Sequence, residues 1–544
     1  MFNKFFRQIK LRIQRAKKHL TGKSVLSSQS RQTFSTSLET NLQQIRLVFS
    51  DCSDITVREF SIGHDQQVKA FVVFVDGLVD MSLLQQNLLK PLMFESHLNP
   101  ARQRTNPGNI LKLIENSTLT MAHLKEVQSM EQAVQGILSG EAAVFVDGYH
   151  VAILAGARGW ESRGVEEPDT EVVVRGPREG FVETLSINTS LLRRKIKNSN
   201  LKIEKLTIGQ QTHTDVAIVY LKGVVNNKMV EEVKRRLKSI DTDSILESGY
   251  IEAFIEDAPF SPFATVGNSE KPDPVAAKLL EGRVAILVDG TPFVLTVPYL
   301  FIESFQVSED YYSRPYYSTL IRWIRFLAYF LTVATPGVYV ALSTHNQEVI
   351  PTPLLLTMAA AREGTPFPAI LEALGMGAIY EILREAGVRL PRPVGQAVSI
   401  VGALVIGESA VGAGIIGAPM VIVIALTAIA GFVIPSQSDS TAIVRLLLVI
   451  LAGILGQYGL ILGISGLLVH LCTLRSFGVP YLSPLAPLTT GDLKDVLVRV
   501  PLWAMFQRPR LIGRKSRVRQ KFSLMPKILD TEKDRATTET KGGK

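Results

Sequence analysis

One long apolar stretch limits what this chain can fold into. Residues 395–434 contain a single charged side chain, that of Glu408. Their length is enough for two membrane-spanning helices of about 20 residues each. Even on a lenient insertion scale, a carboxylate at mid-bilayer costs about 3 kcal/mol, so such a residue usually faces a bundle interior or water. Glu408 is therefore a candidate functional residue.

Apolar residues are unevenly distributed along the chain. Mean hydropathy over the 544 residues is +0.19, yet the long apolar runs begin only after about residue 320. This distribution predicts a soluble N-terminal part followed by a membrane part. The net charge of +9 is concentrated toward the two ends. Because the middle of the chain has no basic patch, we expect no nucleic acid as a partner.

Residues 1–43 are predicted to be a basic tail and a linker. Residues 1–23 hold eight Lys/Arg and no acid, and residues 24–43 are rich in Ser, Thr and Gln. The basic stretch fits either a helix lying on an anionic leaflet or a disordered tail, and both interpretations stay open. No apolar core follows the charges, which argues against a signal peptide.

A short pattern recurs in the soluble part. VFVDG occurs at 73–77 and at 144–148, and ILVDG occurs at 286–290. Each is a β-branched and aromatic run stopped by Asp-Gly, which is typical of a buried strand that enters a tight turn. DVAIVYLKG at 215–223 is a fourth such run, and residues 227–240 have the apolar spacing of an amphipathic helix.

Strands alternating with helices predict an α/β (α+β) soluble region. We expect two subdomains, at roughly 44–138 and 139–300. The recurrence of Asp-Gly is interpreted as similar hairpins and not as a true repeat.

Catalytic and metal-binding motifs are not found. We interpret Asp76, Asp147 and Asp289, the acids of the Asp-Gly pairs, as turn residues, because no His, Cys or Glu stands at ligand spacing. Cys52 and Cys472 are far apart and give neither a disulfide framework nor a zinc motif. No P-loop or His-Glu-x-x-His is present. We therefore expect no enzyme activity, no metal and no cofactor.

The membrane part is expected at residues 315–475, with four to six helices. Residues 321–343 are the first clear span, and the basic residues at its entry place the soluble part in the cytoplasm. Residues 351–393 are interrupted by charges and prolines, which predicts a broken or re-entrant hairpin. Residues 394–434 fit two spans and residues 442–471 another. The basic tail at 476–544 is expected to be cytoplasmic.

If residues 394–412 form one helix, Glu408 shares a face with Val401, Leu404 and Val411. One interpretation is a neutral, hydrogen-bonded Glu that ties helices together. The other is a pore. In a ring of subunits these residues would line the pathway, with Glu408 selecting cations and Leu404 forming an apolar constriction that gates by dewetting.

Six long stretches of this sequence resemble the A subunits of the GerA family of spore germinant receptors. The resemblance covers about residues 45–510, and these stretches are VVVRGPREGFVE (172–183), GRVAILVDGTPFVLTVP (282–298), EDYYSRPYYSTLIRWIRF (309–326), PFPAILEAL (366–374), EILREAGVRLPRPVGQAVSIVGALVIG (381–407) and SFGVPYLSPLAPL (476–488).

The resemblance implies a multi-pass protein of the spore inner membrane that acts in nutrient-triggered germination. It also implies a permease-like B subunit and a lipoprotein C subunit as partners. The A subunits are expected to assemble as a ring, a pentamer, that forms a nutrient-gated channel for monovalent cations. The family's pore-helix stretch usually resembles VIGQAAVEAG. Here Glu408 replaces the Gln and Gly412 replaces the following Glu, so the acid has moved by one turn.

Two alternatives to a channel subunit remain at this stage. Broken helices also occur in secondary transporters and permease-like proteins, although no inverted repeat is evident here. A non-conducting scaffold that assembles the other receptor subunits is the second alternative, and in it Glu408 would be structural.

Overall fold

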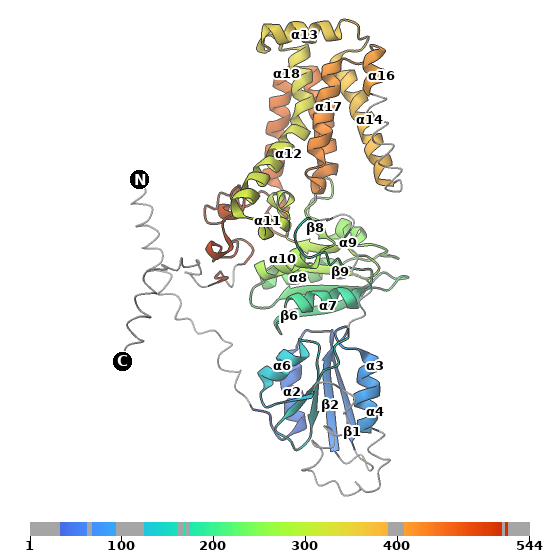
Figure 1. The fold of residues 1–544 in the computed structure, drawn as a ribbon, viewed down its shortest axis with the longest axis vertical. Coiled ribbons are helices and arrows are strands. Elements are labelled where there is room, and N and C mark those ends of the chain that lie inside the picture. Colours follow the sequence, from blue (N-terminus) through green and yellow to red (C-terminus); the bar gives the residue numbers. More distant parts are fainter. Residues whose placement is uncertain are drawn as a thin grey trace, which may run out of the picture.

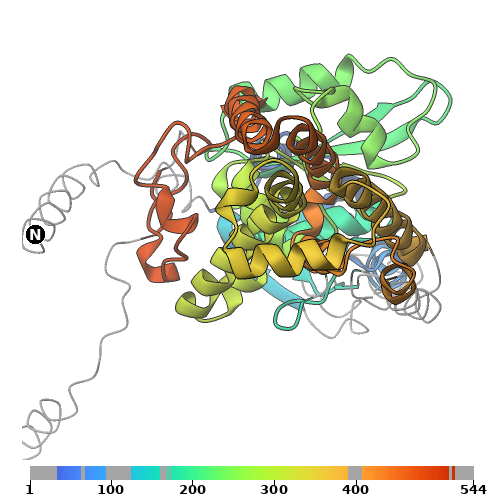
Figure 2. The ribbon, with the colours of Figure 1, turned by 90° about the horizontal axis from the view of Figure 1, so that it is seen from above.

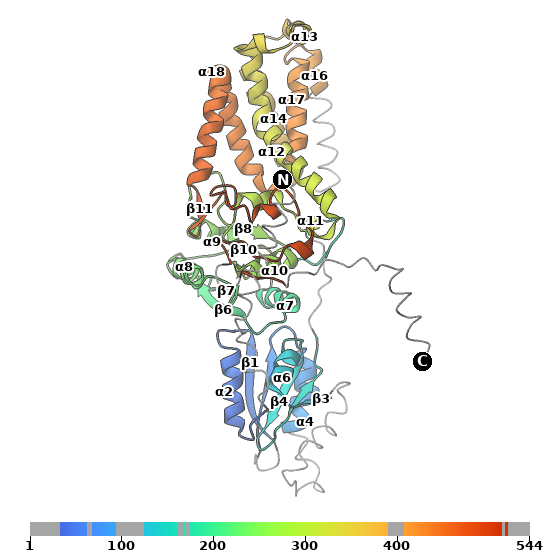
Figure 3. The same cartoon turned by 90° about the vertical axis from the view of Figure 1, so that its left-hand side faces the viewer.

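The computed structural model describes residues 33–62, 68–93, 124–159, 168, 171, 173–389, 407–513 and 517–520. The molecule is elongated (Figures 1 and 3). Two α/β subdomains follow one another along the long axis, and a helical region forms the opposite end. The N-terminal basic stretch lies outside the described residues.

The first subdomain is a five-stranded antiparallel sheet in the order β1-β2-β4-β5-β3. Alternate residues of its central strands point to opposite faces, and both faces are buried under helices. Helices α2 and α6 cover one face, and α3 to α4 cover the other (Figure 1). Its elements are α2 (Leu38–Val48), β1 (Ile55–Ile62), β2 (Val68–Val75), α3 (Met81–Leu84), the π-helix η2 (Gln85–Leu89), α4 (Lys90–Met93), β3 (Leu124–Val127), α6 (Met130–Ile137), β4 (Ala142–Val146) and β5 (Ala152–Ala155).

The second subdomain is a five-stranded antiparallel sheet in the order β6-β7-β9-β10-β8. Helices α7 and α10 pack on one face, and α8 and α9 pack on the other. Its elements are α7 (Leu185–Lys195), β6 (Leu201–Ile208), β7 (Thr214–Leu221), α8 (Asn227–Lys238), α9 (Ser248–Ile255), β8 (Gly267–Ser269), α10 (Pro272–Glu281), β9 (Val284–Val288) and β10 (Val294–Val297).

These two subdomains share one topology. Strand order and helix placement match, and each first helix begins with the same local device. Asn41 exchanges two hydrogen bonds with the backbone of Ser35, and Asn188 does the same with Val182. The α/β region is therefore a structural repeat. The interpretation that the recurring Asp-Gly pairs reflect only similar hairpins is wrong.

The expected boundary between residues 138 and 139 is also wrong. Strands β4 and β5 follow it in sequence but pair with β2 and β3 of the first sheet. The expected boundary assigned β4 and β5 to the second subdomain because they follow residue 138 in sequence, whereas strand pairing in a sheet is set by long-range contacts.

The strands that were expected from the Asp-Gly pattern are confirmed, and so is the amphipathic helix, which is α8. β2, β4 and β9 each end one residue before their Asp-Gly pair. Within α8, Met229, Val233 and Leu237 are buried against the second sheet.

A helical region follows the second subdomain. Its connecting elements are the 3₁₀ helix η6 (Phe301–Phe305) and α11 (Glu309–Tyr312). The remaining elements are α12 (Pro315–Thr344), η7 (Gln347–Val349), α13 (Thr352–Arg362), α14 (Ala369–Arg389), α16 (Gly407–Gly412), α17 (Ala418–Gly431), η9 (Pro435–Gln437) and α18 (Ser438–Thr473). Among the described residues, two helical segments are long and apolar enough to cross a membrane, Pro315–Thr344 and Pro435–Thr473.

The last of these helices is a hairpin. Gly456 lies inside α18 with φ 60° and ψ −138°, which is a non-helical conformation that favours glycine. A Cβ built on Gly463 would lie 2.5 Å from Leu448 Cδ2, and one built on Gly459 would lie 2.0 Å from the carbonyl oxygen of Leu451. The two halves of α18 therefore run back along each other in close contact, which small residues permit.

Residues after α18 fold back onto the second subdomain. They contain β11 (Arg475–Ser476), β12 (Val479–Pro480), η10 (Leu493–Asp495) and η11 (Leu502–Ala504). Val496 and Ile512 join the core of the second sheet. The part of the expected C-terminal tail up to residue 513 is thus folded.

Candidate functional site

The candidate residue Glu408 lies on α16, at the end of the helical region farthest from the sheets (Figure 1). Its side chain is exposed, and Val411, one turn later, is half-buried. The other two expected pore residues, Val401 and Leu404, lie outside the described residues. Two of the four expected pore-lining residues thus lie on one short helix, α16.

Glu408 makes no hydrogen bond or ion pair with any residue that the structure describes. The alternative in which it ties helices together as a hydrogen-bonded acid therefore has no partner within the described chain. An exposed carboxylate in an apolar sequence requires water, or groups from another molecule, to solvate it.

A second acid, Glu372, is buried beside the start of α17. It lies in the first turn of α14 with 2% of its surface exposed, and one carboxylate oxygen accepts from Gly417 N–H at 3.4 Å. Gly417 is the N-cap of α17, so the positive end of that helix dipole faces the acid. Among the residues that the structure describes, the other oxygen of Glu372, Arg362 Nε and the Tyr339 hydroxyl have no hydrogen-bond partner.

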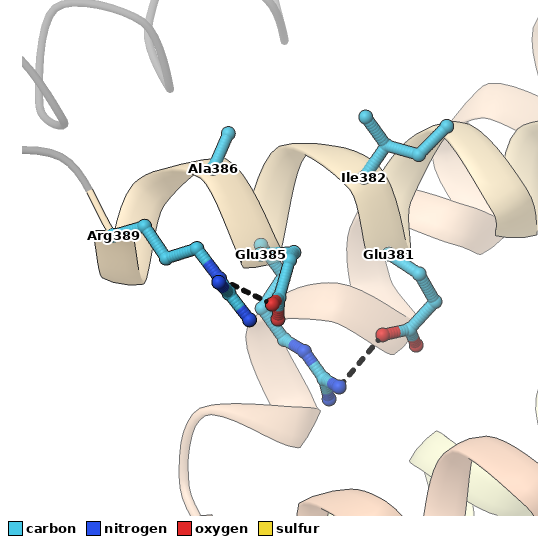
Figure 4. Close-up of a pocket in the computed structure, with 6 residues that line it drawn as sticks. Glu381, Ile382, Glu385, Ala386 and Arg389 are labelled. Atoms are coloured by element: carbon cyan, nitrogen blue, oxygen red, sulfur yellow. Dashed lines mark hydrogen bonds and ion pairs between the residues drawn. The ribbon is translucent and has the colours of Figure 1, made fainter.

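An ion pair joins two helices of the helical region, α18 and α14. Arg445 of α18 is 7% exposed, pairs with Glu381 of α14, and its guanidinium carbon lies 5.4 Å from the centre of the Tyr380 ring. Figure 4 shows an open hollow along α14, where Arg389 also pairs with Glu385 at 2.6 Å. The pairing of Arg445 keeps a charge in an apolar segment from being uncompensated.

Sequence reasoning missed Arg445 and Glu372. Arg445 was visible as a lone cation within the apolar stretch 442–471, and such residues mark functional or packing sites by default. Its partner was not visible, because Glu381 is 64 residues away in sequence.

At the foot of α12, a cluster of charges joins three parts of the chain. Asp310 of α11 accepts from Arg322 Nε at 3.0 Å and from Arg325 at 2.8 Å. Arg322 also donates to Asp495 of the C-terminal segment at 2.9 Å, and the Tyr311 hydroxyl donates to the same residue at 2.9 Å. Arg322 is fully buried. Ion pairs therefore join α12, the connecting helix α11 and the C-terminal segment.

The Asp-Gly acids have structural contacts. Asp147 Oδ1 accepts from Leu38 N–H at 3.1 Å, and Asp289 Oδ1 accepts from Leu185 N–H at 2.9 Å. Each carboxylate thus satisfies a free N–H at the start of a helix. No group of three or more metal-ligating side chains occurs among the described residues.

Together, the fold and these polar groups define a class of protein: a duplicated α/β region joined to a helical region that contains candidate membrane spans. The chain belongs to the family described as Bacillus/Clostridium GerA spore germination protein, whose model matches residues 43–511. It is thus a member of the germinant receptor A subunit family of spore germination, as its sequence resemblance implied.

Individual relatives cover most of the chain. It is 48% identical to "Spore germination protein KA" of Bacillus subtilis (strain 168) over 488 residues, which are 89% of this chain and 88% of that protein. It is 44% identical to "Uncharacterized membrane protein YfkQ" of the same strain, over 88% of this chain and 92% of that protein.

Among solved structures, the N-terminal domain of the A subunit of the Bacillus megaterium spore germinant receptor GerK3 is 37% identical. The match covers 50% of this chain and 98% of the solved GerK3 domain, with a TM-score of 0.40.

Proposed function

We propose that this chain is the A-type subunit of a nutrient germinant receptor of the spore inner membrane, and that several copies form a ring around a cation pathway. The proposal rests mainly on Glu408. It is an exposed acid on α16 without a partner among the described residues, within a stretch of sequence that otherwise lacks charge. A ring of such carboxylates attracts cations and excludes anions.

The arrangement of the chain supports a multi-pass topology. The soluble subdomains and the folded C-terminal segment lie at the same end of the helices (Figures 1 and 3). In this proposal the helical region begins and ends on the same side of a bilayer, which requires an even number of crossings. The basic residues at the foot of α12 favour the cytoplasm as that side. The expected range of four to six crossings contains such even numbers.

The pathway is proposed to lie between copies of the chain. Val401, Leu404, Glu408 and Val411 would line it, with Leu404 as the apolar constriction. A permease-like B subunit and a lipoprotein C subunit, which the family resemblance implies, would complete the receptor and supply the nutrient signal. No cofactor enters this scheme.

Ion flux from vesicles tests the proposal. Purified protein is reconstituted with potassium inside, and efflux of cations and of chloride is measured for the wild type and for Glu408→Gln. We expect the variant to lose preference for cations over chloride. Glu348→Gln is a matched control, because Glu348 is an exposed acid near the same end of the helices.

Two outcomes would contradict the proposal. One is an unchanged ion preference in Glu408→Gln. The other is absence of flux from the wild type even when the receptor's other subunits are present, which would favour the non-conducting scaffold.

A further inference from the structure

A folded segment after α18 has an exposed apolar surface. We name residues 481–513 the C-terminal collar. It lies beside the foot of α12 and extends to one side of the helices (Figures 1 and 2). Its position is level with the start of the first candidate span.

The collar is firmly attached to α12. Asp495 binds Arg322 and Tyr311, as described above. The Trp323 indole N–H donates to Leu497 O at 2.8 Å, and Arg499 N–H donates to Thr319 Oγ1 at 3.1 Å. Tyr481, at its start, is fully buried in an aromatic cluster, and Phe301 N–H donates to its carbonyl oxygen at 3.0 Å. The side of the collar that faces away from the protein is therefore fixed relative to the first span.

Several large apolar side chains of the collar are exposed. The exposed fractions are 66% for Leu488, 45% for Leu497, 47% for Val498, 52% for Leu502 and 40% for Trp503. Four of the five lie within residues 497–503, and a concentration of exposed apolar groups marks an interaction surface.

This surface continues onto the first span. On α12, Leu320 and Trp323 are 54% and 56% exposed, and Leu327, one turn further along, is 59% exposed. A residue such as Trp323 suits the boundary between lipid headgroups and acyl chains.

The collar and the sequence that follows it have an excess of basic residues. Residues 481–513 contain four Lys/Arg and two Asp, and residues 514–521 add five Lys/Arg and no acid. Asp495 is held by Arg322 and Arg499 is 3% exposed, so neither contributes much charge to the surface. A basic segment with exposed Leu and Trp side chains has the composition of a membrane-surface anchor, and it is attracted to anionic lipids.

We propose that the C-terminal collar docks on the anionic surface of the cytoplasmic leaflet, with Leu502 and Trp503 inserted at the headgroup level. This inference rests on the proposed insertion of α12 in a membrane. Lipid fits the surface better than the collar of a second copy, because two such basic segments would repel each other. Val496 and Ile512 of the collar belong to the core of the second subdomain, so the docked collar would hold that subdomain close to the bilayer.

Spin-label accessibility in the full chain tests the docking. The two native cysteines are changed to serine, and a nitroxide label is placed at Leu502→Cys. Leu327→Cys serves as the reference for lipid, and Leu47→Cys, 75% exposed on α2 of the first subdomain, serves as the reference for water. Collision rates with oxygen and with a water-soluble nickel chelate are compared in vesicles of phosphatidylcholine, with and without phosphatidylglycerol.

We expect the label at 502 to favour oxygen, at a shallower depth than the label at 327, and to move deeper when phosphatidylglycerol is present. A label at 502 that behaves like the label at 47 would overturn the proposal. So would protection from both reagents with spin–spin broadening, because a neighbouring copy would then cover the collar. Equal depth in both lipids would overturn the electrostatic attraction. If the label at 327 is also in water, the proposed membrane insertion itself fails.

Discussion

The two α/β subdomains have the same strand order and the same caps, but their surroundings differ. At the residue just before the next strand, β4 or β9, the first subdomain has Glu141 and the second has Arg283. Glu141 pairs with Arg158, which is 54% exposed at its side chain. Arg283 is 4% exposed and binds Glu303 of η6 and the carbonyl oxygen of Pro298.

This difference shows how one fold was adapted to two roles. In the second subdomain, positions equivalent to exposed ones of the first subdomain face η6, α11 and the collar. These contacts join the second subdomain to the helical region. The first is attached to the second through the buried pair of Asp54 with Arg193, at 2.7 Å, and through hydrogen bonds such as that from Ser53 N–H to Ile203 O at 2.8 Å. A structural change in the first subdomain that reaches the helices would therefore pass through the second subdomain.

The largest effect is expected at Arg283. Arg283→Met removes the closer of the two cations that pair with the buried Glu303 and leaves only Lys278, at 3.4 Å, which costs about 3–5 kcal/mol. The free energy of unfolding of the purified chain in detergent, from urea titration, measures it. Glu141→Gln is the matched change in the first subdomain and should cost less than about 1 kcal/mol, because that pair is exposed. Similar losses in both variants would contradict the contrast.

Arg193→Leu should cost about 3 kcal/mol, because it leaves Asp54 buried and unpaired between the subdomains. The double variant Asp54→Val/Arg193→Leu should recover part of the loss, since no uncompensated charge remains. The same urea titration, with proteolysis between residues 155 and 185 as a second readout, measures both. A double variant no more stable than the single one would show that the ion pair does not join the subdomains.

The helix caps should differ by less. Asp289→Ala removes the bond to Leu185 N–H and should cost about 1 kcal/mol. Asp147→Ala should cost less, because the equivalent bond to Leu38 N–H is more exposed to solvent. Thermal unfolding of each variant provides the comparison, and a larger loss in Asp147→Ala would contradict the burial argument.

The smallest effect is a dependence on pH that belongs to the second subdomain. Burial, together with the Glu256 and Glu247 carboxylates, raises the pKa of Glu252 from 4.5 to about 7. The folded state thus binds this proton more tightly than the unfolded chain. The associated stabilisation is complete below about pH 4.5 and is lost as pH rises through about 7. We expect Glu252→Gln to remove this decline in urea titrations between pH 5 and 8. An identical decline in the variant would assign it to other groups.

Local patterns predicted local structure well in this chain. The Asp-Gly pairs marked the ends of β2, β4 and β9, and the spacing of apolar residues marked α8. Glu408 was singled out because the cost of an acid in an apolar stretch follows from the sequence alone. The structure shows it exposed on α16, and its role in a pore stays a prediction.

Long-range features were not predictable. The placement of β4 and β5 depends on which strands they pair with, and a single sequence does not reveal such pairing. The Arg445–Glu381 pair depends on the packing of α14 against α18. The hairpin in α18 had a visible sign, Gly456 and Gly459 in the middle of an apolar stretch, but glycine also occurs in straight membrane helices.

The most direct test of the central claim, that this chain itself forms a cation pathway, is the conductance of the purified oligomer in a planar bilayer. Wild type and Leu404→Ala are compared. The proposal predicts larger, cation-selective currents in the variant, because the apolar constriction has been widened. If neither protein carries current even after the B and C subunits are added, the proposal is contradicted.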